Sequence, residues 1–403
     1  MQTQSANENG ANKLHLLKSF IMVLFLTALV YGQFSLSSDV YYYRDDNLFR
    51  SPDAERDWYN GYSINASYSF SEPGITIYYN PDFYHFDSFS ERNFSIQQGG
   101  VRYTASPFEN ERHNLYLGGT FIKRINRTDY DFYNYNQFYF YGNLRFYWDI
   151  FVLKTGYNFR SRAYTNLSSL NNIRHYVFAQ INKSWPTRTT LMAEIDLGNK
   201  SFTGSETITS VSVDTIPIQR GRGRGHRFIT NEQTDELNGP SFNQIVFWIR
   251  TAQSLHRNIG WYGQYRMQRS LTDDNVIYNS DYYYQDEELF DDPFSYTSDE
   301  FSSQLTFILP WQMQLKVNGS YEDKKYLSDR AYVSATDTVG AGGLRADIQR
   351  TLSIHWSKTF YMQKQWLNEV YVSFGYYVIR NSSNSYWFDY KNQLLSSGLS
   401  VGF

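Results

Sequence analysis

Two residues on one predicted strand have the types and spacing for nucleophilic chemistry. His355 and Ser357 flank Trp356, so strand alternation places their side chains on the same face. An imidazole beside a hydroxyl can activate it for attack on an ester, so the enzymatic alternative is a lipase. However, the pair lies close to a short turn and on the polar face of its strand, and this geometry disfavours attack on a lipid. Because the histidines are scattered without metal-ligand spacing, we expect no enzymatic activity, no metal and no cofactor.

Charged side chains recur on alternate positions of many segments, where they could control the passage of ions. If these positions face an enclosed interior, rings of charge would tune selectivity and tyrosine hydroxyls could bind sugars. The candidate pore-lining residues are Arg145, Lys154, Arg160, Glu194, Asp196, Arg250, Arg266, Lys316, Asp347 and Glu369. The alternative is that these residues only satisfy one another across the wall.

Two long connecting segments differ sharply in charge. Ile218–Arg227 is basic and contains Arg220, Arg222 and Arg224, whereas Asp273–Glu300 has no basic residue. The acidic segment contains Asp286, Glu287 and Glu288. We expect one or both segments to fold toward the pore and set a transverse field at its mouth. Alternatively both are solvated, and the acidic one binds divalent cations between lipopolysaccharide headgroups.

The elements that must position these residues are long strands. In "YSINASYSF", Tyr62, Ile64 and Tyr68 alternate with Ser63 and Asn65, and a two-residue period with one apolar face predicts a strand. The pattern predicts about sixteen strands, with fourteen to eighteen compatible. They lie near residues 35–44, 58–71, 75–86, 93–105, 112–126, 136–147, 150–164, 173–184, 189–200, 243–255, 259–270, 300–309, 312–325, 346–358, 367–380 and 388–403. Gly99 and Gly100 predict a bulge where the parity shifts.

The connections between these strands alternate in length. Short turns are expected around "SEPG", "SWPT" and "LHRN", and long loops at residues 201–242, 271–299 and 326–345. Tryptophans lie at or near the short turns, as expected for an aromatic girdle at the headgroup level of a membrane. They are Trp148, Trp185, Trp261, Trp311, Trp356 and Trp366. This asymmetry is typical of transmembrane barrels, with short periplasmic turns and long extracellular loops.

The N-terminal residues have a different character. Lys13 and Lys18 precede the apolar run "SFIMVLFLTALV", which small residues follow near Gly32. This order predicts a secretory signal peptide over residues 1–32, since the run is too short for a spanning helix. One barrel domain over residues 33–403 is then expected, because no linker or change of composition interrupts the chain.

Composition narrows the function further. The chain has no cysteine, 37 Tyr and 30 Phe, and a net charge of −3. The absence of cysteine excludes a disulfide framework, and the charge argues against nucleic-acid binding. A polar chain can still span a membrane if its polar residues line the inside of a closed sheet, whose backbone groups are all paired.

The C-terminal segment "SSGLSVGF" carries Leu399, Val401 and Phe403 on one parity. With the signal peptide, the long strands and the short turns, this ending resembles the outer-membrane β-barrel proteins of Gram-negative bacteria, whose assembly machinery reads such an ending. The resemblance implies an all-β, antiparallel, up-and-down transmembrane barrel in the outer membrane. Its partners would be outer-membrane lipids and lipopolysaccharide, the barrel-assembly machinery and small solutes, with a homo-oligomer as an option and no nucleic acid.

A sixteen-strand barrel leaves an aqueous channel unless loops close it. The predicted function is therefore an outer-membrane channel for diffusion of small polar or charged solutes. The alternative is a non-conducting barrel that scaffolds a secretion, surface-attachment or polysaccharide-export system.

Overall fold

A computed structural model describes residues 32–70, 72, 74–107, 113–203, 205–220, 223–238, 241–272, 296–364 and 367–403. Within these ranges the structure is almost entirely β-strand, with a few short 3-10 helices. None of the helices in the described part of the chain is both long and apolar enough to cross a bilayer.

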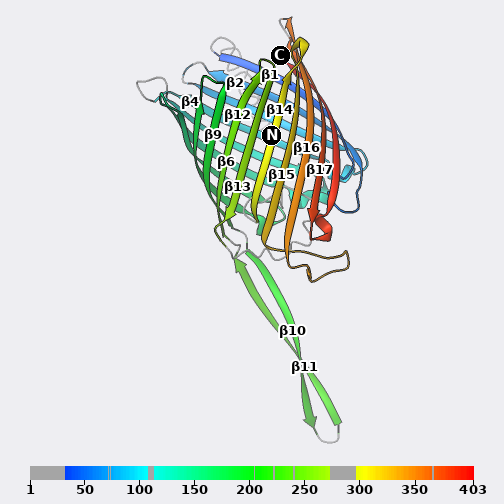
Figure 1. Ribbon diagram of the computed structural model, residues 1–403. Helices are drawn as coiled ribbons and strands as arrows, with labels where there is room; N and C mark the ends of the chain where they lie inside the picture. Colours follow the sequence, from blue (N-terminus) through cyan, green and yellow to red (C-terminus); the bar gives the residue numbers. More distant parts are fainter. Residues whose placement is uncertain are drawn as a thin grey trace, which may run out of the picture.

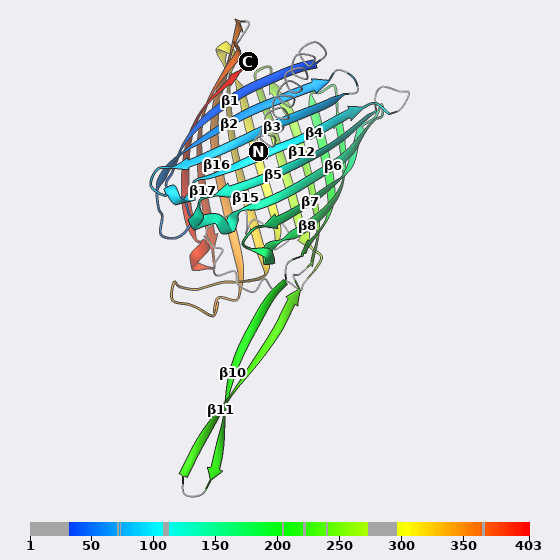
Figure 2. The same ribbon diagram turned by 180° about the vertical axis from the view of Figure 1, so that it is seen from behind.

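Sixteen antiparallel strands close into one barrel (Figures 1 and 2). The first nine are β1 (Gly32–Asp45), β2 (Asp57–Phe70), β3 (Ile75–Phe86), β4 (Phe94–Ala105), β5 (Asn114–Asn126), β6 (Tyr135–Tyr147), β7 (Val152–Tyr164), β8 (Asn172–Ser184) and β9 (Thr189–Phe202). The other seven are β12 (Ser241–His256), β13 (Ile259–Ser270), β14 (Tyr296–Ile308), β15 (Met313–Arg330), β16 (Leu344–Lys364), β17 (Leu367–Ser383) and β18 (Tyr390–Gly402). Closure joins β1 to β18, with Ser37 opposite Gly402 and Asp45 opposite Leu394. The prediction of a sixteen-strand up-and-down barrel is confirmed.

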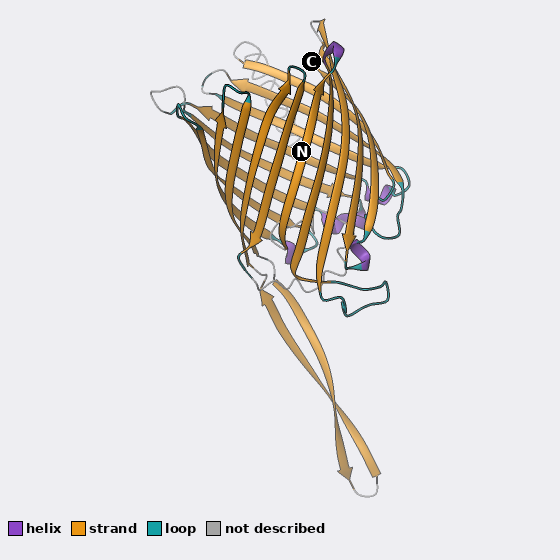
Figure 3. Cartoon of the chain, in the orientation of Figure 1, coloured by secondary structure: helices purple, strands orange, loops and turns teal. Residues whose placement is uncertain are grey.

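The two ends of the barrel differ in their connections. One end, the turn end, holds the start of β1, the end of β18 and brief connections such as residues 148–151 and 257–258. The opposite end, the loop end, holds longer connections and the 3-10 helices η1 (Ser90–Arg92), η2 (Thr128–Tyr133), η3 (Ser168–Leu170) and η6 (Tyr386–Phe388) (Figure 3). The predicted alternation of short turns and long loops is therefore present.

One predicted loop contains regular structure. Within residues 201–242, β10 (Ser205–Arg220) and β11 (Gly223–Asn238) pair along their whole length as a separate two-stranded sheet. This ribbon extends away from the loop end of the barrel (Figure 1). The sequence gives a signal for β10, since Thr207, Thr209, Val211 and Val213 follow a two-residue period of β-branched residues.

The outer surface of the barrel is apolar. Phe138 is 60% exposed and Phe301 is 57% exposed, and both belong to the outward parity of their strands. Leu395, Leu399 and Phe403 continue this parity to the end of β18, and the Phe403 N–H donates to the Leu36 carbonyl at 2.9 Å. Trp311 is 77% exposed at the turn end, where Trp148 and Trp185 are also exposed. Exposed apolar side chains over a closed sheet require a surrounding apolar solvent, so the strands cross a bilayer.

The predicted bulge at Gly99 and Gly100 is wrong. The register between β3 and β4 runs without a shift from Tyr79 opposite Gly99 to Tyr78 opposite Gly100. The apolar parity breaks because Phe94 and Ile96 take inward positions and not because a residue is inserted. Gly100 is instead required by close approach, since a Cβ there would lie 2.6 Å from the Tyr78 hydroxyl oxygen.

Candidate functional site

The candidate site is the barrel lumen, formed by the side chains on the inward parity of each strand. Every residue that the sequence predicts to line the pore takes this parity in the register of the sheet. These residues are Arg145, Lys154, Arg160, Glu194, Asp196, Arg250, Arg266, Lys316, Asp347 and Glu369. They do not form one cluster, because they come from eight strands spread around the barrel.

One sector of the lumen is uniformly basic. On β4 to β8 the inward positions hold seven cations, Arg102, Arg124, Arg145, Lys154, Arg160, Arg162 and Arg174, and these strands carry no carboxylate at an inward position. We call this set the basic wall. Among its members the sequence analysis identified only Arg145, Lys154 and Arg160.

Aromatic rings hold most of these cations in place. The guanidinium carbon of Arg102 lies 4.3 Å from the ring centre of Tyr78, and that of Arg124 lies 4.2 Å from Phe94. Arg162 stands 4.3 Å from the ring of Tyr135. Each pair joins neighbouring strands, so the cation is attracted to the negative face of the ring and held against the wall. The charges are thus presented to the lumen in fixed positions.

The neighbouring sector has the opposite charge. Inward positions of β1 to β3 carry Asp39, Asp45, Asp57 and Asp82 and no cation. We call this set the acidic wall. Asn65 Nδ2 donates to Asp39 Oδ2 at 2.7 Å, and Ser63 Oγ donates to Asp82 Oδ1 at 2.5 Å. The donors to these two carboxylates are neutral side chains, in contrast to the ion pairs found elsewhere in the lumen.

In the third sector, on β9, β12 and β13, the charged groups contact polar neighbours. Trp248 Nε1 donates to Glu194 at 2.9 Å, and Arg250 Nε donates to Gln264 at 2.8 Å. Arg266 lies 3.8 Å from Glu300 of β14. Arg266 and Glu300 therefore form an ion pair between neighbouring strands. This is the arrangement in which lining charges satisfy one another across the wall.

The loop end contains an ion cluster that sequence reasoning missed. Arg345 Nε donates to both carboxylate oxygens of Asp347, at 3.1 and 3.0 Å, and Arg345 Nη1 donates to Asp329 at 3.1 Å. The guanidinium also lies 4.1 Å from the ring centre of Tyr326. Only the Arg345–Asp347 pair leaves a sequence signal, since residues two apart on a strand share a face.

Inward side chains at the loop end are packed against their neighbours. Inward residues from many strands are buried there, and Gln268 has no exposed surface. This set, the loop-end layer, comprises Tyr135, Phe202, Phe242, Gln244, Gln268, Ser298, Tyr326, Asp347, Asn381 and Asn392. Toward the turn end, Arg102 and Glu369 on the same inward parity are exposed. The lining side chains are therefore more crowded at the loop end than at the turn end.

The His355–Ser357 pair faces the lumen as expected. His355 Nε2 lies 3.3 Å from the hydroxyl of Tyr371. A phenol in this position does not supply the carboxylate that orients a catalytic imidazole. Among the described residues, no group of three or more histidines and carboxylates could hold a metal ion.

The predicted loop charges lie elsewhere or outside the described residues. The backbone of Arg220 and Arg224 is at the tip of the ribbon, where Arg220 is opposite Gly223. In this arrangement the basic segment extends away from the barrel and does not fold toward its lumen (Figure 1). Arg222, Asp286, Glu287 and Glu288 lie outside the described residues.

These features define a class of protein. A closed antiparallel barrel with an apolar exterior and a charged interior is a transmembrane β-barrel. No family model and no curated relative matches the chain. Among solved structures it is similar to OccAB1 of Acinetobacter baumannii, with a TM-score of 0.51 and 10% identity over 92% of this chain and 96% of that one. At this identity the likeness concerns the fold.

Two further solved structures are similar at lower scores. One is OccK8 (OprE) of Pseudomonas aeruginosa, with a TM-score of 0.47 and 11% identity over 92% of this chain and 98% of that one. The other is described as a bacterial polysaccharide outer membrane secretin, with a TM-score of 0.47 and 6% identity over 91% of this chain and 97% of that one.

Proposed function

We propose that this chain is an outer-membrane channel through which small polar or charged solutes diffuse. The observation that supports the proposal best is the polar lumen enclosed by sixteen strands and lined by fixed charges. A barrel of this strand number has room for water between its walls, unlike barrels of about eight strands, which side chains fill. The fold likeness to OccAB1 agrees with this function.

The distribution of charge gives the proposed channel a preference. The basic wall on β4 to β8 faces the wall formed by β14 to β18, where Glu300, Glu322, Asp347 and Glu369 lie among three cations. An anion that follows the basic wall meets no carboxylate on those five strands. We therefore propose that anions pass more readily than cations of the same size, because the lining charge lowers their energy in the lumen.

The loop-end layer limits the size of the solute. Because its side chains are buried, we expect passage beside them to be narrow, and a large sugar would have to displace packed residues. Solutes of the size of a monosaccharide or a small organic acid fit this proposal.

One observation favours the alternative of a non-conducting barrel. The loop-end layer is packed, and the β10–β11 ribbon extends beyond it in a form suited to contact a partner. In that case the barrel would anchor the ribbon for a secretion, surface-attachment or export system.

Conductance distinguishes the two functions. The purified mature chain is inserted into planar bilayers. We expect stepwise increases in conductance, and in a salt gradient a reversal potential whose sign indicates anion selectivity. Liposome swelling with sugars of graded size then gives the cut-off. A folded, inserted barrel that carries no current would reject the channel and favour the scaffold.

We also propose that residues 1–32 are a cleaved signal peptide and that Leu399, Val401 and Phe403 form the assembly signal. Phe403 is exposed at the end of β18, so its ring is accessible to an assembly factor. Phe403→Ser should reduce the heat-modifiable, membrane-inserted form about tenfold, whereas Ser400→Ala on the inward parity should not. Equal assembly of both variants would argue against the signal.

A further inference from the structure

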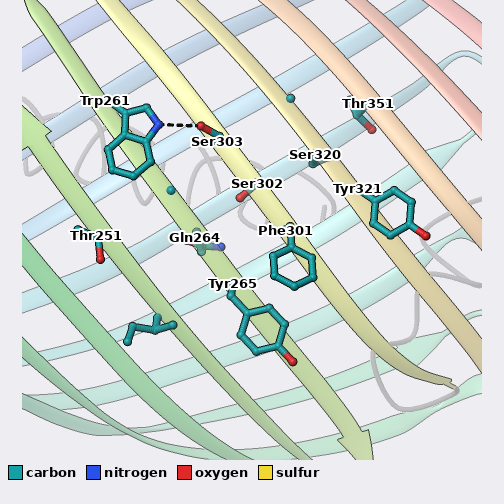
Figure 4. A pocket seen from close by; sticks show the side chains of 13 residues that line it. Thr251, Trp261, Gln264, Tyr265, Phe301, Ser302, Ser303, Ser320, Tyr321 and Thr351 are labelled. Atoms are coloured by element: carbon teal, nitrogen blue, oxygen red, sulfur yellow. Dashed lines mark hydrogen bonds between the residues drawn. The ribbon is translucent and has the colours of Figure 1, made fainter. Parts of the chain in front are cut away.

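The outer wall of the barrel carries a groove that the proposed channel does not use. It lies on β12 to β15 and has a volume of about 620 Å³. Trp261, Tyr265, Phe301 and Tyr321 surround it, and Figure 4 shows these rings on neighbouring strands. All four belong to the outward parity, so the groove faces the hydrocarbon and not the lumen.

The register of the sheet explains the groove. Thr251, Gly263, Ser303 and Gly319 are cross-strand partners in one outward row. The next outward row toward the loop end is bulky and contains Tyr265, Phe301 and Tyr321. The next outward row toward the turn end is also bulky and contains Trp261, Leu305 and Val317. A row of small side chains between two bulky rows leaves a depression along about 14 Å of the wall. The Trp261 ring lies over Gly263, where a Cβ would be 2.9 Å from the ring, so the deepest open part is at Gly319.

Contacts within the groove keep it open. Trp261 Nε1 donates to Ser303 Oγ at 2.9 Å, and the rings of Tyr265 and Phe301 lie 4.8 Å apart. These contacts fix the side walls. At Gly319 an added Cβ would meet only the Thr351 carbonyl oxygen at 3.8 Å, so the space above this residue is empty.

Cations stand at the loop-end side of the groove. Arg350 is the cross-strand partner of Tyr321, and Lys325 lies four residues beyond Tyr321 on β15. Asp323 lies between them on the same outward parity, opposite Asp299, so the two cations flank a carboxylate pair. Both are exposed on the outward parity, about four strand residues or roughly 13 Å apart. A third cation, Arg269, is not counted among the phosphate ligands, because its guanidinium donates to both oxygens of Asp299 at 2.8 Å.

We propose that this groove binds one acyl chain of a phosphorylated lipid of the outer leaflet, with its phosphates at Lys325 and Arg350. The occupant must be apolar because hydrocarbon surrounds the groove, and the row of small residues admits a narrow chain. The two cations then select a phosphorylated lipid, since an exposed ammonium or guanidinium pairs with phosphate oxygens. This inference requires that the barrel spans the outer membrane with its loop end outside, and it does not require conduction, so failure of channel activity leaves it standing.

The test uses two matched glycine variants. Gly319→Val fills the groove, whereas Gly119→Val adds the same side chain to an outward position of β5 where a Cβ meets nothing within 4 Å. Each detergent-solubilised protein is titrated with bisphosphorylated lipid A, its dephosphorylated form and a diacyl phosphatidylethanolamine, and bound lipid is measured by native mass spectrometry. Heat-modifiable migration on gels confirms that each variant is folded.

For the wild type we expect one tightly held lipid A, at least fivefold weaker binding for Gly319→Val and binding within twofold of wild type for Gly119→Val. The double variant Lys325→Ala, Arg350→Ala should lose the preference for the phosphorylated form. Equal binding by Gly319→Val and wild type, or equal losses in both glycine variants, would overturn the site. A dimer that Gly319→Val abolishes would identify a second copy as the occupant and also overturn it. Equally strong binding of all three lipids would contradict the proposed phosphate contacts at Lys325 and Arg350.

Discussion

Arg345 and Asp347, two residues apart on β16, form a buried ion pair in which one guanidinium nitrogen donates to both carboxylate oxygens. The same guanidinium donates to Asp329 on β15 at 3.1 Å. The pair therefore joins the ends of two strands where the barrel wall meets the loop of residues 331–343. Its burial determines what a substitution costs, because the Asp347 side chain is only 2% exposed and its carboxylate cannot turn to bulk water.

Replacement of Arg345 by Met should destabilise the barrel by about 3 kcal/mol, because it leaves buried Asp347 without its cation. Urea unfolding followed by tryptophan fluorescence in detergent measures the change. Arg380→Met is the control, since its ion pair with Asp389 is 48% and 44% exposed and should contribute less than about 1 kcal/mol. Equal effects of the two substitutions would show that burial does not decide the cost.

Gly100→Ala should destabilise the barrel by about 1–3 kcal/mol, because the new Cβ overlaps the Gly119 carbonyl and the Tyr78 hydroxyl. Gly99→Ala on the same strand is the matched control. Its Cβ would meet Tyr78 and Tyr79 atoms at 3.6 Å, an ordinary contact distance. The midpoint of urea unfolding should therefore be lower for Gly100→Ala than for Gly99→Ala. The reverse order would contradict the close approach of Tyr78 to Gly100.

Neutralising the basic wall should change ion selectivity. In the triple variant Arg145→Gln, Lys154→Gln, Arg160→Gln, each lost charge at about 7 Å in water removes about 0.6 kcal/mol of attraction for an anion. The anion-to-cation permeability ratio from reversal potentials should therefore fall at least about threefold. The control is Lys123→Gln, Lys325→Gln, Arg350→Gln, which changes the net charge equally on exposed outward positions. An unchanged ratio in the first variant would exclude the basic wall from selectivity.

The loop between β15 and β16 should respond to acid through Asp337. Backbone N–H groups of Val333, Val339, Gly340 and Ala341 donate to its carboxylate and lower its pKa to about 2. Since the folded pKa lies below the unfolded value of about 3.9, the ionised group stabilises the loop above pH 4. This contribution is lost as the pH falls through about 2.

Amide resonances of the loop in detergent give the titration midpoint. We expect the midpoint near 2 for the wild type and no transition in Asp337→Asn, which has no proton to take up. A midpoint close to 4 would mean that these backbone donors do not hold the carboxylate in solution.

The sequence alone determined the strands and their faces. Each outward residue, such as Phe138 or Phe301, must be apolar because it contacts hydrocarbon, whatever its neighbours on other strands are. The alternation of apolar and polar residues is therefore visible within a single strand of the sequence. For the same reason the inward parity of Arg145 and Glu369 followed from their neighbours in the chain. The predicted bulge at Gly100 was wrong because two apolar residues, Phe94 and Ile96, face the lumen and break that rule.

The tertiary structure decided which residues meet. Asp329 and Arg345 come together only when β15 and β16 pair, and the groove exists only because Gly263, Ser303 and Gly319 fall into one row. Register across strands is a property of the closed sheet. It joins residues far apart in sequence, so the local periodicity of the sequence does not predict it. The crowded loop end has the same cause, since burial of Gln268 depends on neighbouring strands such as β12 and β14.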